Sequence, residues 1–91
     1  MRLDKFLKVS RLIKRRTLAK EICDGGRVFV NGKAAKAGTN VKAGDEIEIR
    51  FGHKIVTVKV EDVKDSARKE EASSLFTVVK EEYVKKDDVI L

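Results

Sequence analysis

The chain has 91 residues, enough for one small domain, and its hydrophobic content of 42% supports a modest core. Its charge is uneven, because residues 1–50 hold 13 Lys and Arg against 6 Asp and Glu, while residues 51–91 hold 8 against 9. A basic half beside a nearly neutral half favours a polyanion as the partner. A Lys-rich surface that is merely solvated stays open as the alternative.

The composition also excludes several classes of protein. No apolar segment approaches the ~20 residues needed to span a bilayer, so we expect no membrane partner. The first residues are charged and lack the apolar run of a signal peptide. The single cysteine, Cys23, cannot form an internal disulfide, which fits a reducing compartment. We therefore expect a cytoplasmic protein.

The first predicted element is a helix over about residues 3–10. Its apolar residues Leu3, Phe6 and Leu7 follow the i, i+3, i+4 spacing of a stripe that is buried along a helix. Arg2, Lys5 and Lys8 are spaced by three and fall on a neighbouring face, so its second side is cationic. A short basic connection over residues 11–16 is expected to follow.

A second helix is predicted from Leu18 to Gly25. Thr17 is its expected N-cap, because a threonine hydroxyl can accept a hydrogen bond from an amide of the first turn. The buried side of this helix is expected to hold Leu18, Ala19, Ile22 and Cys23. The pair Gly25-Gly26 should end the helix in a left-handed C-cap.

Short β-strands are predicted next, beginning with Val28–Val30. Asn31-Gly32 is the strongest hairpin signal in the chain, because both central residues of a type I′ turn need positive φ, and a strand over residues 33–36 should follow it. Residues 46–51 and 55–62 alternate apolar and polar side chains, which predicts a long hairpin of half-buried strands.

The segment after residue 62 is predicted to be less regular. We expect a brief helix over residues 67–73 that is capped by Ser66, and then a strand over residues 75–79. The apolar end, Val89–Leu91, has no obvious partner, and the last residues are expected to be loose.

Few residues could carry catalysis. The one histidine, His53, stands in a predicted turn without a cysteine or carboxylate cluster near it in the sequence. Cys23 stands on a predicted buried face, which favours an unreactive core thiol. We therefore expect no enzyme activity, no metal and no cofactor.

Basic residues without acidic neighbours are the strongest functional signal. Arg11, Lys14, Arg15 and Arg16 have no acid within four residues in either direction, so a polyanion would relieve their repulsion. Aromatic residues for base stacking are scarce, which favours recognition of structured RNA through its shape and phosphates. The predicted RNA-binding residues are Arg2, Lys5, Arg11, Lys14, Arg15, Arg16, Lys33 and Lys36. If six to eight basic residues meet phosphates, the log–log slope of affinity against salt should be on the order of −4 to −7.

Four segments together form a pattern over about residues 1–50. They are Arg2–Lys5, Lys14–Thr17, Gly26–Gly32 and Val41–Asp45. This pattern resembles the alpha-L RNA-binding domain first described in the fourth small-subunit ribosomal protein. The resemblance implies an α+β fold, with two N-terminal helices packed on a small, mainly antiparallel β-sheet.

Two further expectations follow from the resemblance. The alpha-L type RNA-binding domain is expected over residues 1–62, with a C-terminal extension over residues 63–91. Asp4 is expected to orient a neighbouring arginine, or to cap the first helix, where an acid suits the helix dipole.

The short chain is most similar to stand-alone members of this family, which include fifteen-kilodalton heat-shock proteins and factors of ribosome-associated quality control. The similarity implies a monomer that binds the large ribosomal subunit carrying peptidyl-tRNA and contacts 23S rRNA and the tRNA. With a tRNA-recruiting partner protein it would support alanine tailing of stalled chains. The heat-shock branch implies rescue of the blocked subunit instead, but its longer basic extension is not matched here.

Two alternatives to these roles stay open. The domain also occurs attached to RNA-modifying enzymes and tRNA synthetases, although the residues after it are too few here to build a catalytic fold. A general polyanion-binding module, including one that binds DNA, is the other.

Overall fold

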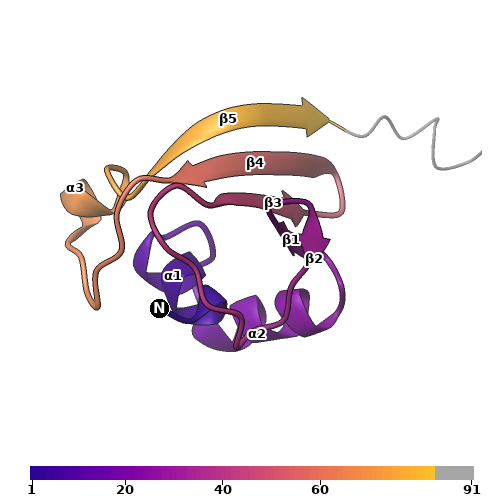
Figure 1. Ribbon diagram of the computed structural model, residues 1–91, viewed down its shortest axis with the longest axis horizontal. Coiled ribbons are helices and arrows are strands. Elements are labelled where there is room, and N and C mark those ends of the chain that lie inside the picture. Colours follow the sequence, from indigo (N-terminus) through magenta and orange to yellow (C-terminus); the bar gives the residue numbers. More distant parts are fainter. Residues whose placement is uncertain (84–91) are drawn as a thin grey trace, which may run out of the picture.

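The computed structural model describes residues 1–83, in which two helices pack on one face of an antiparallel sheet (Figure 1). Along the chain the elements are α1 (Leu3–Val9), α2 (Arg16–Asp24), β1 (Val28–Val30), β2 (Lys33–Ala34), β3 (Glu46–Arg50), β4 (Lys54–Val60), α3 (Lys69–Ala72) and β5 (Phe76–Tyr83). The predicted α+β fold is confirmed. Within these residues, no helix has the length and apolar character needed to cross a membrane.

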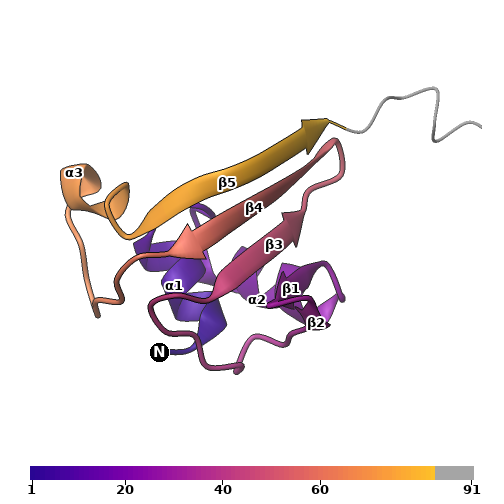
Figure 2. The ribbon, with the colours of Figure 1, turned by 45° about the horizontal axis from the view of Figure 1, so that its top comes forward.

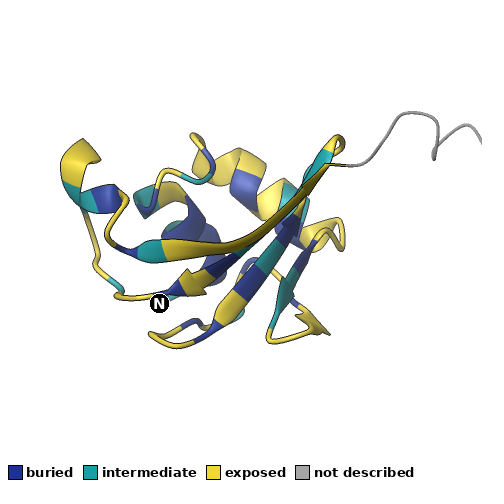
Figure 3. Ribbon diagram, turned by 90° about the horizontal axis from the view of Figure 1, so that it is seen from above, coloured by how far each residue is buried: buried dark blue, intermediate teal, exposed yellow. Residues whose placement is uncertain are grey.

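The sheet has five strands in the order β2-β1-β3-β4-β5, and every neighbouring pair is antiparallel. Helices α1 and α2 lie on one face of it, and α3 lies at the end of the molecule opposite the β3–β4 turn (Figures 1 and 2). The predicted hairpin is confirmed, because β3 pairs with β4 along its whole length. Buried residues alternate with more exposed ones along both strands (Figure 3), as the period-2 pattern requires.

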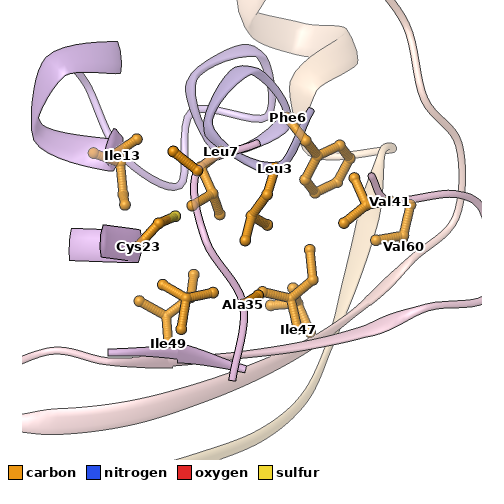
Figure 4. Close-up of a cluster of buried hydrophobic side chains, with 14 of the residues drawn as sticks. Leu3, Phe6, Leu7, Ile13, Cys23, Ala35, Val41, Ile47, Ile49 and Val60 are labelled. Atoms are coloured by element: carbon orange, nitrogen blue, oxygen red, sulfur yellow. The ribbon is translucent and has the colours of Figure 1, made fainter. Parts of the chain in front are cut away.

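The core lies between α1 and the sheet. Leu3 and Leu7 point from α1 toward Ile47 and Ile49 of β3, and Phe6 lies beside Val41 (Figure 4); the side chains of Leu3, Phe6, Leu7, Ile47 and Ile49 are fully buried. Burying an aliphatic or aromatic side chain of this size stabilises the fold by roughly 1.5–3 kcal/mol. The helical spacing in the sequence therefore identified the main anchor of α1 correctly.

The turn between β1 and β2 is held by the Asn31 side chain. Asn31 and Gly32 both have positive φ, 51° and 82°, as the predicted type I′ turn needs. The Asn31 amide donates to Asp45 (3.1 Å), and its oxygen accepts from the Glu46 N–H (2.9 Å). The turn is thereby joined to the start of β3, the strand that pairs with β1.

The predicted start of the second helix is wrong. Helix α2 begins at Arg16 after an extended Arg15, so Thr17 lies inside the first turn and caps nothing. Two tertiary contacts set where the connection ends: Ile13 is buried in the core, and Arg16 pairs with Asp4. These contacts override the local preference of threonine for the N-cap position.

The predicted buried stripe of α2 is too wide. Ala19 and Cys23, four residues apart, are fully buried, and Ile22 is half-buried against the core. Leu18 is 45% exposed, contrary to the prediction. Helix α2 contacts the core mainly through the small side chains of Ala19 and Cys23, and Leu18 lies outside that narrow contact.

Other predicted boundaries shift by a few residues. Helix α3 follows Arg68 rather than Ser66, so the predicted Ser66 cap is wrong. Strand β5 extends past the predicted end to Tyr83, because β4 offers pairing partners along its whole length. Strand β2 is shorter than the predicted strand over 33–36. The expectation for Val89–Leu91 lies outside the described residues.

Two leucine substitutions test this account of the helices. Leu7→Ala removes a fully buried side chain and should lower the free energy of unfolding by about 2–5 kcal/mol, measured by urea denaturation. Leu18→Ala is the matched control, since Leu18 is 45% exposed, and it should cost less than about 1 kcal/mol. Equal losses in the two variants would contradict the packing of α2.

Candidate RNA-binding surface

The backbone at Arg2 is fixed before α1 begins. Arg2 forms an antiparallel bridge with Asn40, and the Leu3 N–H donates to the Thr39 carbonyl at 2.7 Å. The segment between β2 and β3 therefore holds the chain end in place. Arg2 starts from a rigid position rather than from a free terminus.

Asp4 of α1 holds two arginines, Arg2 just before α1 and Arg16 at the start of α2. Its Oδ1 accepts from Arg2 Nε (3.2 Å) and from the Lys5 N–H (2.8 Å), and its Oδ2 accepts from Arg16 Nε (3.5 Å). The Asp4 side chain is 3% exposed, while Arg2 and Arg16 are 51% and 49% exposed. The expectation that Asp4 orients an arginine is confirmed, and two arginines are held. We call Arg2 and Arg16 the arginine pair.

The carboxylate of Asp4 stays charged at neutral pH. Burial on its own would raise its pKa, but the positive charge of Arg16 and hydrogen bonds from the Lys5 N–H and Arg16 outweigh burial. The charge of Arg2 adds to this effect, and the pKa falls below its usual value of 3.8. The anion that holds the arginine pair is therefore present under cellular conditions.

The basic connection divides into paired and unpaired residues. Arg16 has no acid near it in the sequence, yet the fold brings Asp4 to it across twelve residues. Arg11, Lys14 and Arg15 are exposed and take part in no ion pair among residues 1–83. In the sequence these four residues look alike, because none has an acid within four residues. Within residues 1–83 of the structure, only Arg16 among them has an ion-pair partner.

The remaining predicted residues lie on other elements. Lys5 on α1 pairs with Asp65 at 3.1 Å. Lys33 is exposed on β2, and the Lys36 ammonium donates to the Asp24 carbonyl at the end of α2 (3.3 Å). The structure thus brings Arg2 and Arg16 together through Asp4 but does not gather all eight residues at one point. RNA binding stays a prediction for each of them.

A shallow hollow of about 320 Å³ surrounds the arginine pair. Besides the pair and Asp4, it is lined by Thr17 and Lys20, which were not among the predicted residues. Lys20 stands four residues after Arg16 on α2, so helical spacing could have indicated it. Two guanidinium groups and an ammonium around one hollow suit a phosphate group.

Residues 1–47, more than half of the chain, match the S4 domain. The chain belongs to the S4 domain family. The matched region spans α1, α2, β1, β2 and the start of β3, and it contains the arginine pair and Asp4. The family predicted from the four sequence segments is confirmed.

The relatives of this S4 domain protein extend the match over nearly the whole chain. An RQC P-site tRNA stabilizing factor of Halalkalibacterium halodurans is 67% identical over 97% of this chain and 100% of its own. Its namesake from Bacillus subtilis is 63% identical over 90% and 95%. A trimeric structure of heat shock protein 15 from Vibrio cholerae has a TM-score of 0.81 and 38% identity, covering 87% and 81%.

The cysteine and the histidine of the S4 domain protein lie in different surroundings. Cys23 is fully buried, and burial, followed by the charges of Asp4 and Asp24, raises the pKa of its thiol to about 11. His53 is exposed in the turn between β3 and β4. Both placements confirm the sequence-based expectations. In the described part of the chain, no three His, Cys, Asp or Glu residues gather as a metal site requires.

Asp4→Asn tests the anchoring of the arginine pair. The variant keeps the shape of Asp4 but removes its charge, so we expect the free energy of unfolding to fall by about 1–2 kcal/mol at pH 7 in urea denaturation. Asp65→Asn is the matched control, because Asp65 pairs with Lys5 while 92% exposed, and it should cost less than about 0.5 kcal/mol.

The same variant predicts a pH dependence. Because the folded-state pKa of Asp4 is lowered, its stabilisation is complete above its unfolded-state pKa of 3.8 and is lost as the pH falls through the folded value. The stability difference between the wild type and Asp4→Asn should therefore shrink below about pH 4. A difference that does not change with pH would contradict this role of the Asp4 charge.

Proposed function

We propose that this S4 domain protein is a non-enzymatic RNA-binding factor of bacterial ribosome-associated quality control. It binds the large ribosomal subunit that carries peptidyl-tRNA, contacts 23S rRNA and the tRNA, and stabilises the tRNA in the P site. It supports C-terminal alanine tailing of stalled nascent chains, together with a tRNA-recruiting partner protein. It acts in the cytoplasm on the ribosome, as a monomer and without a cofactor.

The Asp4-anchored arginine pair is the observation that carries this proposal. Two half-exposed guanidinium groups, one from the residue before α1 and one from the first residue of α2, are held by one buried carboxylate. A guanidinium presents a planar fork of donors that matches the oxygens of a phosphate. Since Asp4 itself is hardly accessible, an approaching RNA backbone meets the two cations rather than the anion.

The relatives support the biological setting. Those from Halalkalibacterium halodurans and Bacillus subtilis carry the name RQC P-site tRNA stabilizing factor, and both match this chain nearly end to end. A stabilising factor contributes binding energy rather than chemistry. This agrees with the buried, protonated thiol of Cys23.

Sedimentation with large ribosomal subunits tests the surface. Arg2→Ala combined with Arg16→Ala should weaken association at least about tenfold and reduce the log–log salt slope by about 2, one unit for each lost phosphate contact. The matched control is Lys59→Ala with Lys80→Ala, which removes two cations from the sheet face away from the helices. This control should bind as the wild type does.

The control also separates a specific surface from general attraction to polyanions. Equal weakening in both double variants would favour a general polyanion-binding module and contradict the proposed surface. Competition between 23S rRNA and duplex DNA at one fixed salt concentration distinguishes the same two possibilities. A specific factor should prefer the rRNA, whereas a general polyanion-binding module should bind both.

A second candidate function is rescue of blocked large subunits without a role in tailing. The likeness to heat shock protein 15 of Vibrio cholerae favours it, since the two folds agree over most of both chains. Reconstituted large subunits carrying peptidyl-tRNA, with the tRNA-recruiting partner present, separate the two functions. The tailing function predicts that alanine incorporation rises when this chain is added. If the tRNA is stably retained but alanine incorporation does not rise, the result supports rescue.

A further inference from the structure

A second hollow, of about 290 Å³, is lined only by basic residues. These are Lys8, Arg11, Lys14 and Lys69. They come from three parts of the chain: the last turn of α1, the connection to α2, and the first residue of α3. Lys69 stands more than fifty residues after the others, so folding alone brings it to them. We call this site the basic hollow.

No carboxylate among the described residues lines the basic hollow. Its four cations are exposed, and none of them belongs to an ion pair among the described residues. On α3, Glu71 pairs with Lys64 at 3.6 Å, and neither Glu70 nor Glu71 lines the hollow. Four like charges around one space repel each other, and a bound anion would remove that repulsion.

The backbone holds Arg11 in an unusual conformation at this site. Its φ is 63°, in the left-handed region that few residues other than glycine adopt. The Arg11 N–H donates to the Lys8 carbonyl (3.1 Å), and the Ile13 N–H donates to the Leu7 carbonyl (3.1 Å). Because Ile13 and Leu7 are buried, the core imposes this bend. Such imposed conformations are common at binding sites.

Helix α3 is anchored well enough to place Lys69. Ala72 and Leu75 are buried, and the Glu61 N–H donates to the Leu75 carbonyl at 2.8 Å. The ion pair between Lys5 and Asp65 ties the loop before α3 to α1. Figures 1 and 2 show α3 at the end of the molecule opposite the β3–β4 turn.

We propose that the basic hollow binds a backbone phosphate of structured RNA, so that α3 adds a contact to those of the S4 domain. This proposal rests on the proposed function, because it assumes that RNA is the ligand. A polymer backbone suits the site better than a free anion, since Lys5 stands three residues after Arg2 of the arginine pair and three residues before Lys8 of the hollow. Lys69 lies outside the region that matches the S4 domain.

Substitution of Lys69 tests the proposal in the full chain. Lys69→Ala should weaken binding to isolated large subunits several-fold and reduce the log–log salt slope by about 1, and Lys69→Glu should weaken binding further. Lys59→Ala and Lys59→Glu are the matched controls, because Lys59 is also exposed and unpaired within residues 1–83 but faces away from the helices. Lys69 variants that bind like the Lys59 variants, with the wild-type slope, overturn the proposal.

A chemical footprint tests it without substitution. Acetylation of the wild-type protein, read by mass spectrometry, should modify Lys8, Lys14 and Lys69 less when 23S rRNA is bound, while Lys59 stays reactive. Inorganic phosphate alone, in a second arm, should protect these lysines far less than the rRNA does. Protection by inorganic phosphate but not by the rRNA would assign the hollow to a free anion and overturn the proposal.

The outcomes for the two surfaces can be told apart. If Arg2→Ala with Arg16→Ala loses binding while Lys69→Glu binds normally, the basic hollow is not an RNA site and the proposed function stands. If Lys69→Glu weakens binding and the arginine double variant does not, the hollow is supported and the arginine pair is not the main contact. If neither change affects binding, both proposals fail.

Discussion

A buried carboxylate organises the basic half of this protein. An ionised side chain can be removed from water only if donors replace its hydration, and Asp4 obtains them from Arg2, Arg16 and the Lys5 N–H. Because Arg16 supplies part of this replacement, the start of α2 is held close to the start of α1. Among the described residues, no buried polar side-chain atom lacks a partner. The interaction that the interior requires therefore also sets the direction of two surface cations.

The two basic sites differ in what a phosphate would gain there. At the arginine pair, Asp4 has already ordered the guanidinium groups, so binding loses little side-chain entropy. Asp4 also cancels part of their charge. At the basic hollow none of the described lining residues is a carboxylate, but Lys8, Lys14 and Lys69 must give up rotamer freedom there. The arginine pair is therefore suited to orienting the RNA. The basic hollow is suited to strong binding whose affinity falls steeply as salt rises.

Local patterns in the sequence predicted the elements, and tertiary contacts decided the rest. The spacing of Leu3, Phe6 and Leu7 found α1, and the Asn31-Gly32 pair found the turn, because each depends on neighbours within a few residues. The pairing of Arg16 with Asp4 spans twelve residues, and no local rule reports it. The same reason explains why Thr17 failed as a cap, why Leu18 proved exposed, and why Lys69 gave no signal at all.

The residues after the matched S4 domain are part of its core. The match ends at residue 47, inside β3, yet Ile49, Val58, Val60 and Leu75 are fully buried in the same cluster as Leu3 and Phe6. Strand β4 and the segment that leads to β5 thus close the interior beneath α1. The contacts that bury Leu75 also hold α3, and with it Lys69. Stability and the shape of the basic surface are therefore coupled, because a chain that lacked this segment would lose part of its core together with one wall of the basic hollow.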